Sequence, residues 1–141
     1  MATLIAYSPI DESGQYFRNI DGWWKALADF IIDRCPDLLR DGEAEAWFRD
    51  DGHIVGAETA SAIADRLDQL IERGVVKKHE IEFELTYPPV VCSSCSGTGI
   101  QNQAECVACR GRGKLNLSYF TEDNVRAFAR FAKNSGGFDI Y

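Results

Sequence analysis

The stretch CSSCSGTGIQNQAECVACRGRG, residues 92–113, contains the same eight-residue pattern twice. The pattern CxxCxGxG occurs at 92–99 and again at 106–113, and the segment IQNQAE separates the two copies. Within each copy the spacing lets two thiolates bind one ion from a single turn, and two such turns supply the closed tetrahedral sulfur shell that structural zinc prefers. The stretch therefore predicts one structural zinc ion per chain, with the ligands Cys92, Cys95, Cys106 and Cys109.

Four glycines accompany the cysteines: Gly97, Gly99, Gly111 and Gly113. Glycine readily takes positive φ, and here it leaves backbone amides free to donate hydrogen bonds to the sulfurs, which disperses thiolate charge. Four cysteines leave no coordination position for water, so the metal is expected to be structural and not catalytic. Reversible disulfides or another soft metal remain as alternatives, and an iron–sulfur centre fits the glycine-bearing pattern less well.

The paired pattern resembles half of the cysteine-rich region of DnaJ-type (Hsp40) co-chaperones, whose repeats pair to hold zinc and help to engage polypeptides. The resemblance covers residues 92–113 only, and the chain has no HPD-bearing J-domain and no Gly/Phe-rich linker, so it does not imply co-chaperone activity. The remainder is similar to uncharacterised small proteins of bacteria and their phages. That similarity rests on GQYFRN, WWKALADFI, DDGHIVGAETASAIADRL and the ending FAKNSGGFDIY, and it implies a phage or prophage setting.

On both sides of the cysteines, apolar residues alternate with polar ones. HEIEFELTY at 79–87 places Ile81, Phe83, Leu85 and Tyr87 on one side and three glutamates, Glu80, Glu82 and Glu84, on the other, until Pro88 and Pro89 end the pattern. KLNLSYF at 114–120 alternates in the same way. A period of two is typical of a strand with one buried face. The two segments predict the arms of an extended antiparallel hairpin that carries the metal-binding segment at its tip.

Helical spacing dominates further from the cysteines. One helix is predicted from Asp21, as its N-cap, to the stop at Pro36, a second over 57–73 with Gly74 after it, and a third from the N-cap Thr121 to the Ser135–Gly137 segment. A short helical stretch is expected near 43–48, a turn at 50–52 and a short strand at FDIY. The prediction is therefore an α+β fold: about three main helices on a small antiparallel sheet, in one domain over 1–141, with residues 92–113 as a zinc-knuckle insertion.

Composition and charge limit the partners and the location. The 141 residues are 45% hydrophobic and carry a formal net charge of -7, which disfavours nucleic acid and anionic membranes and favours basic partners. The N-terminal residues lack the basic and apolar regions of a signal peptide, and no stretch is long enough to span a membrane. A cytoplasmic location is expected, where closely spaced cysteines are typically metal ligands.

The function that these features favour is that of a non-enzymatic zinc-binding protein that recognises a macromolecular partner, most simply a protein. An outward knuckle suits such contacts, and Arg110, Arg112 and Lys114 make it locally basic. A phage-encoded regulator or inhibitor of a host system would fit this description. The alternative is a small-ligand protein that stacks a nucleotide-like ring on Trp23 or Trp24. No nucleophile or acid/base set indicates an enzyme, and His53 and His79 are expected at the surface.

Overall fold

Four strands from distant parts of the chain form one antiparallel sheet. In the computed structural model, which describes residues 1–141, the sheet has the order β2-β1-β8-β3. The strands are β1 (Ala2–Ala6), β2 (Tyr16–Asn19), β3 (His53–Val55) and β8 (Phe138–Ile140). Alternate side chains point to the inner face and are buried there: Leu4, Phe17, Val55, Phe138 and Ile140.

Helices pack on the inner face of this sheet and bury an aromatic core. The four main helices are α1 (Asp21–Arg34), α3 (Ala57–Glu72), α4 (Val75–Thr86) and α5 (Glu122–Ser135), and α2 (Glu43–Ala46) is short. Phe128 and Phe131 of α5 meet Phe17 and Phe138 of the sheet at ring-centroid distances of 5.3–6.0 Å. The α+β prediction is confirmed, with four main helices where about three were expected.

The predicted helix boundaries hold at most positions. Thr121 caps α5, because its side chain accepts a hydrogen bond from the Asn124 amide at 3.1 Å. Helix α1 ends at Arg34, before Pro36, as predicted. The predicted cap at Asp21 is wrong: Ile20 is the N-cap, and Asp21 is the first helical residue, whose carboxylate pairs with the N-terminal amine.

The segment 79–87 is mostly helical, so the strand predicted there is wrong. It belongs to α4, which follows α3 after Gly74, a residue with φ of 76°. Helical spacing places Val76 and Phe83 toward the core, whereas Ile81 and Leu85, which a strand would have buried, are exposed. The three glutamates of this segment therefore do not form one exposed face of a strand. Glu80 points inward and accepts a hydrogen bond from the Glu122 amide at 2.9 Å.

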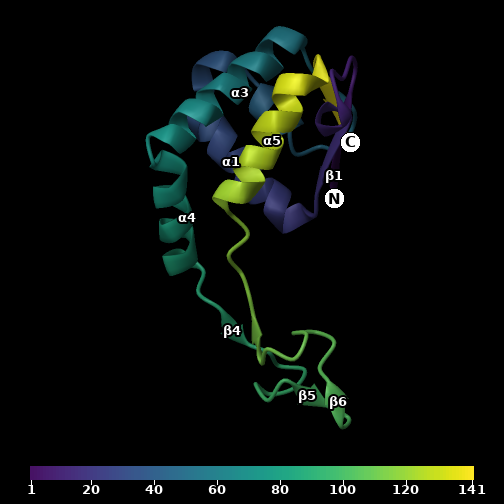
Figure 1. The fold of residues 1–141 in the computed structure, drawn as a ribbon, viewed down its shortest axis with the longest axis vertical. Coiled ribbons are helices and arrows are strands. Elements are labelled where there is room, and N and C mark those ends of the chain that lie inside the picture. The colour runs from purple at the N-terminus through teal and green to yellow at the C-terminus, as the bar shows by residue number, and fades with distance from the viewer.

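The hairpin arms are consequently short. Strand β4 (Val90–Val91) pairs with β7 (Lys114–Leu115), and this two-residue ladder is the neck that carries the cysteine segment. In Figure 1 the segment between β4 and β7 projects from the end of α4, away from the sheet and the helices. The hairpin that bears the cysteines is thus confirmed, although its predicted length is not.

Neither histidine lies free on the surface, contrary to expectation. The His79 ring packs between Phe30 and Phe120, with centroid distances of 4.8 and 4.4 Å. His53 Nε2 lies 3.3 Å from an oxygen of the buried Glu43 carboxylate. Both side chains therefore serve the packing of the helices and the sheet. None of the helices combines the length and the apolar character that a membrane crossing requires.

Candidate metal centre

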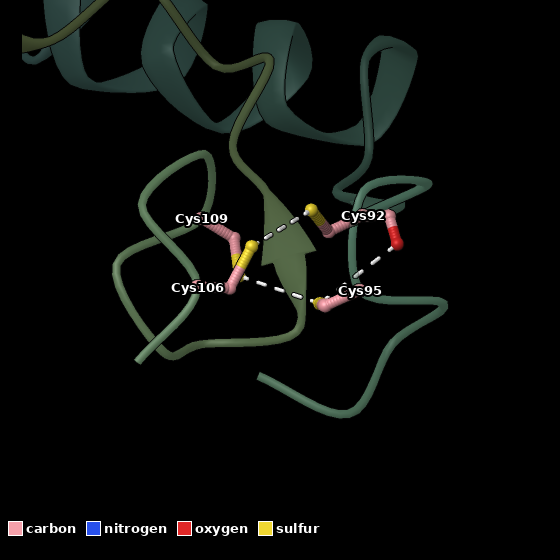
Figure 2. Close-up of side chains that lie close together, drawn as sticks. All are labelled: Cys92, Cys95, Cys106 and Cys109. Carbon is pink, nitrogen blue, oxygen red and sulfur yellow. Dashed lines mark hydrogen bonds between the residues drawn. The ribbon is translucent and has the colours of Figure 1, made fainter. Parts of the chain in front are cut away.

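The two CxxCxGxG turns bring four buried thiols together at the end of the neck. We call residues 92–113 the knuckle. Its outer end is closed by a second short ladder, β5 (Ile100–Gln101) with β6 (Ala104–Glu105), which returns the chain from the first turn to the second. Figure 2 shows the four cysteine side chains pointing toward one another from the two turns. As predicted, one cluster contains Cys92, Cys95, Cys106 and Cys109.

The sulfur distances match the shell of a single metal ion. All four sulfur atoms lie within 4.8 Å of one another. Cys92 Sγ and Cys106 Sγ are 3.9 Å apart, and Cys95 Sγ and Cys109 Sγ are 3.7 Å apart (Figure 2). A tetrahedral zinc ion with Zn–S bonds of about 2.3 Å sets its sulfurs about 3.8 Å apart, whereas a disulfide requires about 2.05 Å. The residues therefore fit a metal ion such as zinc and are not arranged as disulfides.

The two turns are related by an internal two-fold repeat. The Cys92 amide donates to the Gly113 carbonyl at 3.0 Å, and the equivalent Cys106 amide donates to the Gly99 carbonyl at 2.9 Å. The two short ladders are equivalent as well. Strand β4, before the first turn, corresponds to β6, before the second, and β7, after the second turn, corresponds to β5, after the first. The repeated sequence thus folds into a repeated structure, and each half contributes two thiols to one shared site.

The glycines serve both the backbone turns and the sulfurs. The Gly99 amide donates to Cys95 Sγ at 3.2 Å, and the Gly113 amide donates to Cys109 Sγ at the same distance. The Gly97 and Gly111 amides instead donate to the carbonyls of Cys92 and Cys106, both at 3.1 Å. All four glycines have positive φ, between 75° and 84°. The two amide–sulfur bonds orient the second thiol of each turn, Cys95 or Cys109, toward the metal position and stabilise its thiolate form.

The thiols do not ionise independently. Burial opposes ionisation of Cys95, but the Gly99 amide and the neighbouring thiols donate hydrogen bonds to its sulfur and lower the pKa of Cys95 to about 6. The pKa of Cys106 is raised: hydrogen bonding from the Cys109 backbone favours its thiolate, but burial and the thiols of Cys109 and Cys95 oppose it more strongly. A divalent cation removes this conflict because it neutralises the charge of the clustered thiolates.

The surface of the knuckle and its neck is both basic and apolar. Arg110 and Lys114 are exposed, while Arg112 is exposed but donates from Nε to the Cys109 carbonyl at 3.2 Å. Apolar side chains lie among them: Val107 is 89% exposed, and Ile100 and Val91 are also exposed. These exposed apolar residues were not predicted from the sequence. The signal was the pair Val107–Ala108 inside the second CxxC, where the first CxxC has two serines.

The two tryptophans predicted to stack a ligand, Trp23 and Trp24, lie far from the knuckle along the chain and in different surroundings. Trp24 is buried, stacks on Trp47 at a centroid distance of 5.8 Å and donates from Nε1 to the Trp47 carbonyl. Trp23 is half-buried beside Tyr119. Of the two, Trp23 is therefore the ring that remains accessible to a ligand, and stacking there stays a prediction.

Comparison with known proteins adds no family or activity. No known protein family matches the chain, no curated protein matches it, and neither does any solved structure. The resemblance to DnaJ-type proteins therefore rests on the paired cysteine pattern alone. The structure itself shows a buried four-cysteine cluster positioned to hold a metal ion such as zinc.

Proposed function

We propose that the protein is a zinc-binding interaction protein, without catalytic activity, whose knuckle docks on a protein partner. The observation that carries this proposal is the separation of the knuckle from the rest of the fold. The four cysteines form a buried cluster of their own, with Leu115 as the partly buried hydrophobic residue packed against it, apart from the core shared by the helices and the sheet. A metal site that served only to stabilise the core would be expected to pack against it.

The closed sulfur shell supports an interaction role over catalysis. Catalytic zinc keeps a position open for water or substrate, whereas four thiolates fill a tetrahedral shell. Zinc would then fix the shape of the knuckle and hold its surface in place. Exposed apolar side chains next to arginines are typical of the centre of protein interfaces. Val107, Ile100 and Arg110 supply that combination.

The proposed partner is a protein, and nucleic acid is disfavoured. The basic side chains of the knuckle and its neck number three, Arg110, Arg112 and Lys114, in a chain of net charge -7. Phosphate binding along a nucleic acid depends on several cationic contacts and would face repulsion from the acidic remainder. The setting we propose is that of a phage or prophage regulator or inhibitor, on the resemblance of the other segments to small bacterial and phage proteins.

The proposal is tested by cross-linking and mass spectrometry of the tagged protein in bacterial cells. Arg110→Ala with Lys114→Ala should remove one or more cross-linked proteins from the set captured by the unchanged protein. Arg112 is left intact because it holds the Cys109 carbonyl. The matched control is Lys77→Ala with Lys78→Ala, which removes the same charge from α4, where both lysines are exposed.

Each variant must first retain one zinc per chain by native mass spectrometry, so that loss of capture reports on the surface and not on folding. Unchanged cross-links in the knuckle variant, or equal losses in the control, would exclude the knuckle as the docking site.

A hollow beside the neck favours small-ligand binding as the second candidate function. It has a volume of about 340 Å³ and lies between α1, α4 and the segment after β7, with the aromatic side chains of Phe83, Tyr87 and Tyr119 in its wall. Aromatic walls suit a flat ring. Native mass spectrometry of the purified protein distinguishes this function, because a copurifying small molecule would be lost in Tyr87→Ala and retained in the knuckle variant.

A further inference from the structure

The outer face of the sheet carries a contiguous group of exposed apolar and aromatic side chains. Strand register places Tyr16, Ile5, Asp139 and Ile54 in one row across the four strands. Tyr7 extends beyond β1 on the same face, and Tyr141 follows Asp139 two residues later. The exposed fractions of Ile5, Tyr7, Tyr16, Ile54 and Tyr141 lie between 47% and 63%. A continuous apolar face rich in tyrosine is typical of a protein–protein interface.

A carboxylate without a cationic partner lies within this face. Asp139 accepts hydrogen bonds from the hydroxyl of Tyr7 and, at 3.3 Å, from the hydroxyl of Tyr141. The hydrogen bond to Asp139, with a smaller contribution from burial, raises the pKa of Tyr7 to about 12, so Tyr7 stays a donor at neutral pH. None of the ion pairs in the chain includes Asp139.

A guanidinium without an anionic partner lies on the same face. Arg18 of β2 is opposite Thr3 of β1, one row away from Asp139, and is exposed. Its side chain takes part in no ion pair within 4.0 Å. The face therefore presents one positive and one negative group, on the two strands that flank β1.

We propose that this face is the interface of a two-fold dimer, in which Arg18 of each copy binds Asp139 of the other. Because β1 lies between β2 and β8, a two-fold axis parallel to β1 places β2 of one copy over β8 of the second copy. The same operation places Ile5 of one copy opposite Ile5 of the second copy, at the centre of the interface. An isologous interface needs this self-complementarity: where Arg18 of the first copy meets Asp139 of the second, Asp139 of the first copy also meets Arg18 of the second.

Each component of the interface has its own effect on association. Facing sheets pack about 10 Å apart, a gap that the tyrosines and isoleucines of both copies would fill with buried apolar surface. The two ion pairs fix the orientation, because sliding or reversing one sheet on the other separates them. A dimer of this kind would also present two knuckles to a partner, which strengthens binding to any partner with two sites.

Charge exchange tests the proposal. Sedimentation velocity of the zinc-loaded protein, from micromolar to sub-millimolar concentration, should show a concentration-dependent dimer. Arg18→Asp alone and Asp139→Arg alone should each yield a monomer, because each places like charges opposite one another. Arg18→Asp combined with Asp139→Arg restores opposite charges and should restore the dimer. Arg110→Asp, on the knuckle, is the control and should leave the dimer intact.

Three outcomes would overturn the proposal: a monomer at every concentration, a dimer that survives both single exchanges, and a folded double variant that stays monomeric. Circular dichroism establishes folding in each case. Should Asp139→Arg fail to fold, Asp139→Asn and Arg18→Gln take its place. Each removes one charge without reversing it and should weaken dimerisation at least tenfold, whereas an unchanged dissociation constant would exclude the ion pair.

Discussion

Gly99 and Gly113 occupy backbone positions that no residue with a side chain can fill. A Cβ atom at Gly99 would lie 2.4 Å from the carbonyl oxygen of Gly111, and one at Gly113 would lie 2.5 Å from that of Gly97. These close approaches are the two-fold contact between the turns, and they place each amide within hydrogen-bonding distance of a sulfur. At the residue scale, the metal site thus depends on glycine at these two positions as well as on the four cysteines.

Alanine at Gly99 should weaken zinc binding more than alanine at Gly97. Both positions have positive φ, which costs alanine about 1–2 kcal/mol. At Gly97, however, the nearest atom to the new Cβ would belong to the side chain of Val91, at 3.2 Å, which can move. We expect a loss in zinc affinity of about tenfold for Gly97→Ala and clearly more for Gly99→Ala. Competition with a chromophoric chelator measures both, and equal losses would show that the carbonyl contact is unimportant.

His79 should make the free energy of unfolding depend on pH. Its burial among aromatic rings lowers the pKa of His79, and nearby Arg34 lowers it further. The unfolded chain, in which histidine has its ordinary pKa of about 6.5, then binds a proton more readily than the folded protein does. Stability should therefore fall as the pH drops below about 6.5, and His79→Phe should lose this part of the dependence. Urea unfolding of the unchanged protein and of His79→Phe, at about pH 7.5 and about pH 5.5, measures the difference.

At the scale of elements, α4 shows how two periodic patterns can coexist in one segment. Residues 79–87 alternate with a period of two, but Val76, Phe83 and Tyr87 also recur at helical spacing, and Lys77 and Lys78 pair with glutamates along a helix. The helix forms because its apolar side packs against aromatic residues elsewhere in the chain: the ring centroids of Phe83 and Phe120 lie 6.1 Å apart. No local signal in the alternating segment specifies that distant contact.

Two substitutions in α4 distinguish a helix from a strand in solution. In a strand, Phe83 and Leu85 would share one buried face and both substitutions would be costly. In the structure Phe83 packs against the core, whereas Leu85 is 77% exposed. Phe83→Ala should lower the free energy of unfolding by about 1–3 kcal/mol, and Leu85→Ala should change it by less than about 0.5 kcal/mol. Chemical denaturation measures both, and similar losses would favour the strand.

For the whole molecule, the sequence predicts local features well and distant pairings poorly. The metal ligands, the Thr121 cap and the FDIY strand were predicted because each depends on residues close together in the chain. Strands β1, β2 and β3 were not predicted. Strand β1 has apolar residues on both faces, which hides the alternation, and its partner β8 lies at the other end of the chain. The outer face of the sheet could not be foreseen without that pairing.

The separate burial of knuckle and core predicts the effect of removing zinc. The main core comprises 26 buried residues from the helices and the sheet, and the cysteines form a second cluster that shares none of them. Loss of the metal should therefore unfold residues 92–113 and leave the rest folded, unlike a domain whose folding depends on its metal. Amide NMR spectra recorded before and after chelation should lose dispersed signals only from the knuckle and its neck, and Cys92→Ser with Cys106→Ser should give the same spectrum. Loss of dispersed signals from the sheet and α5 would show that the metal stabilises the whole fold, and the knuckle would then no longer be a separate module.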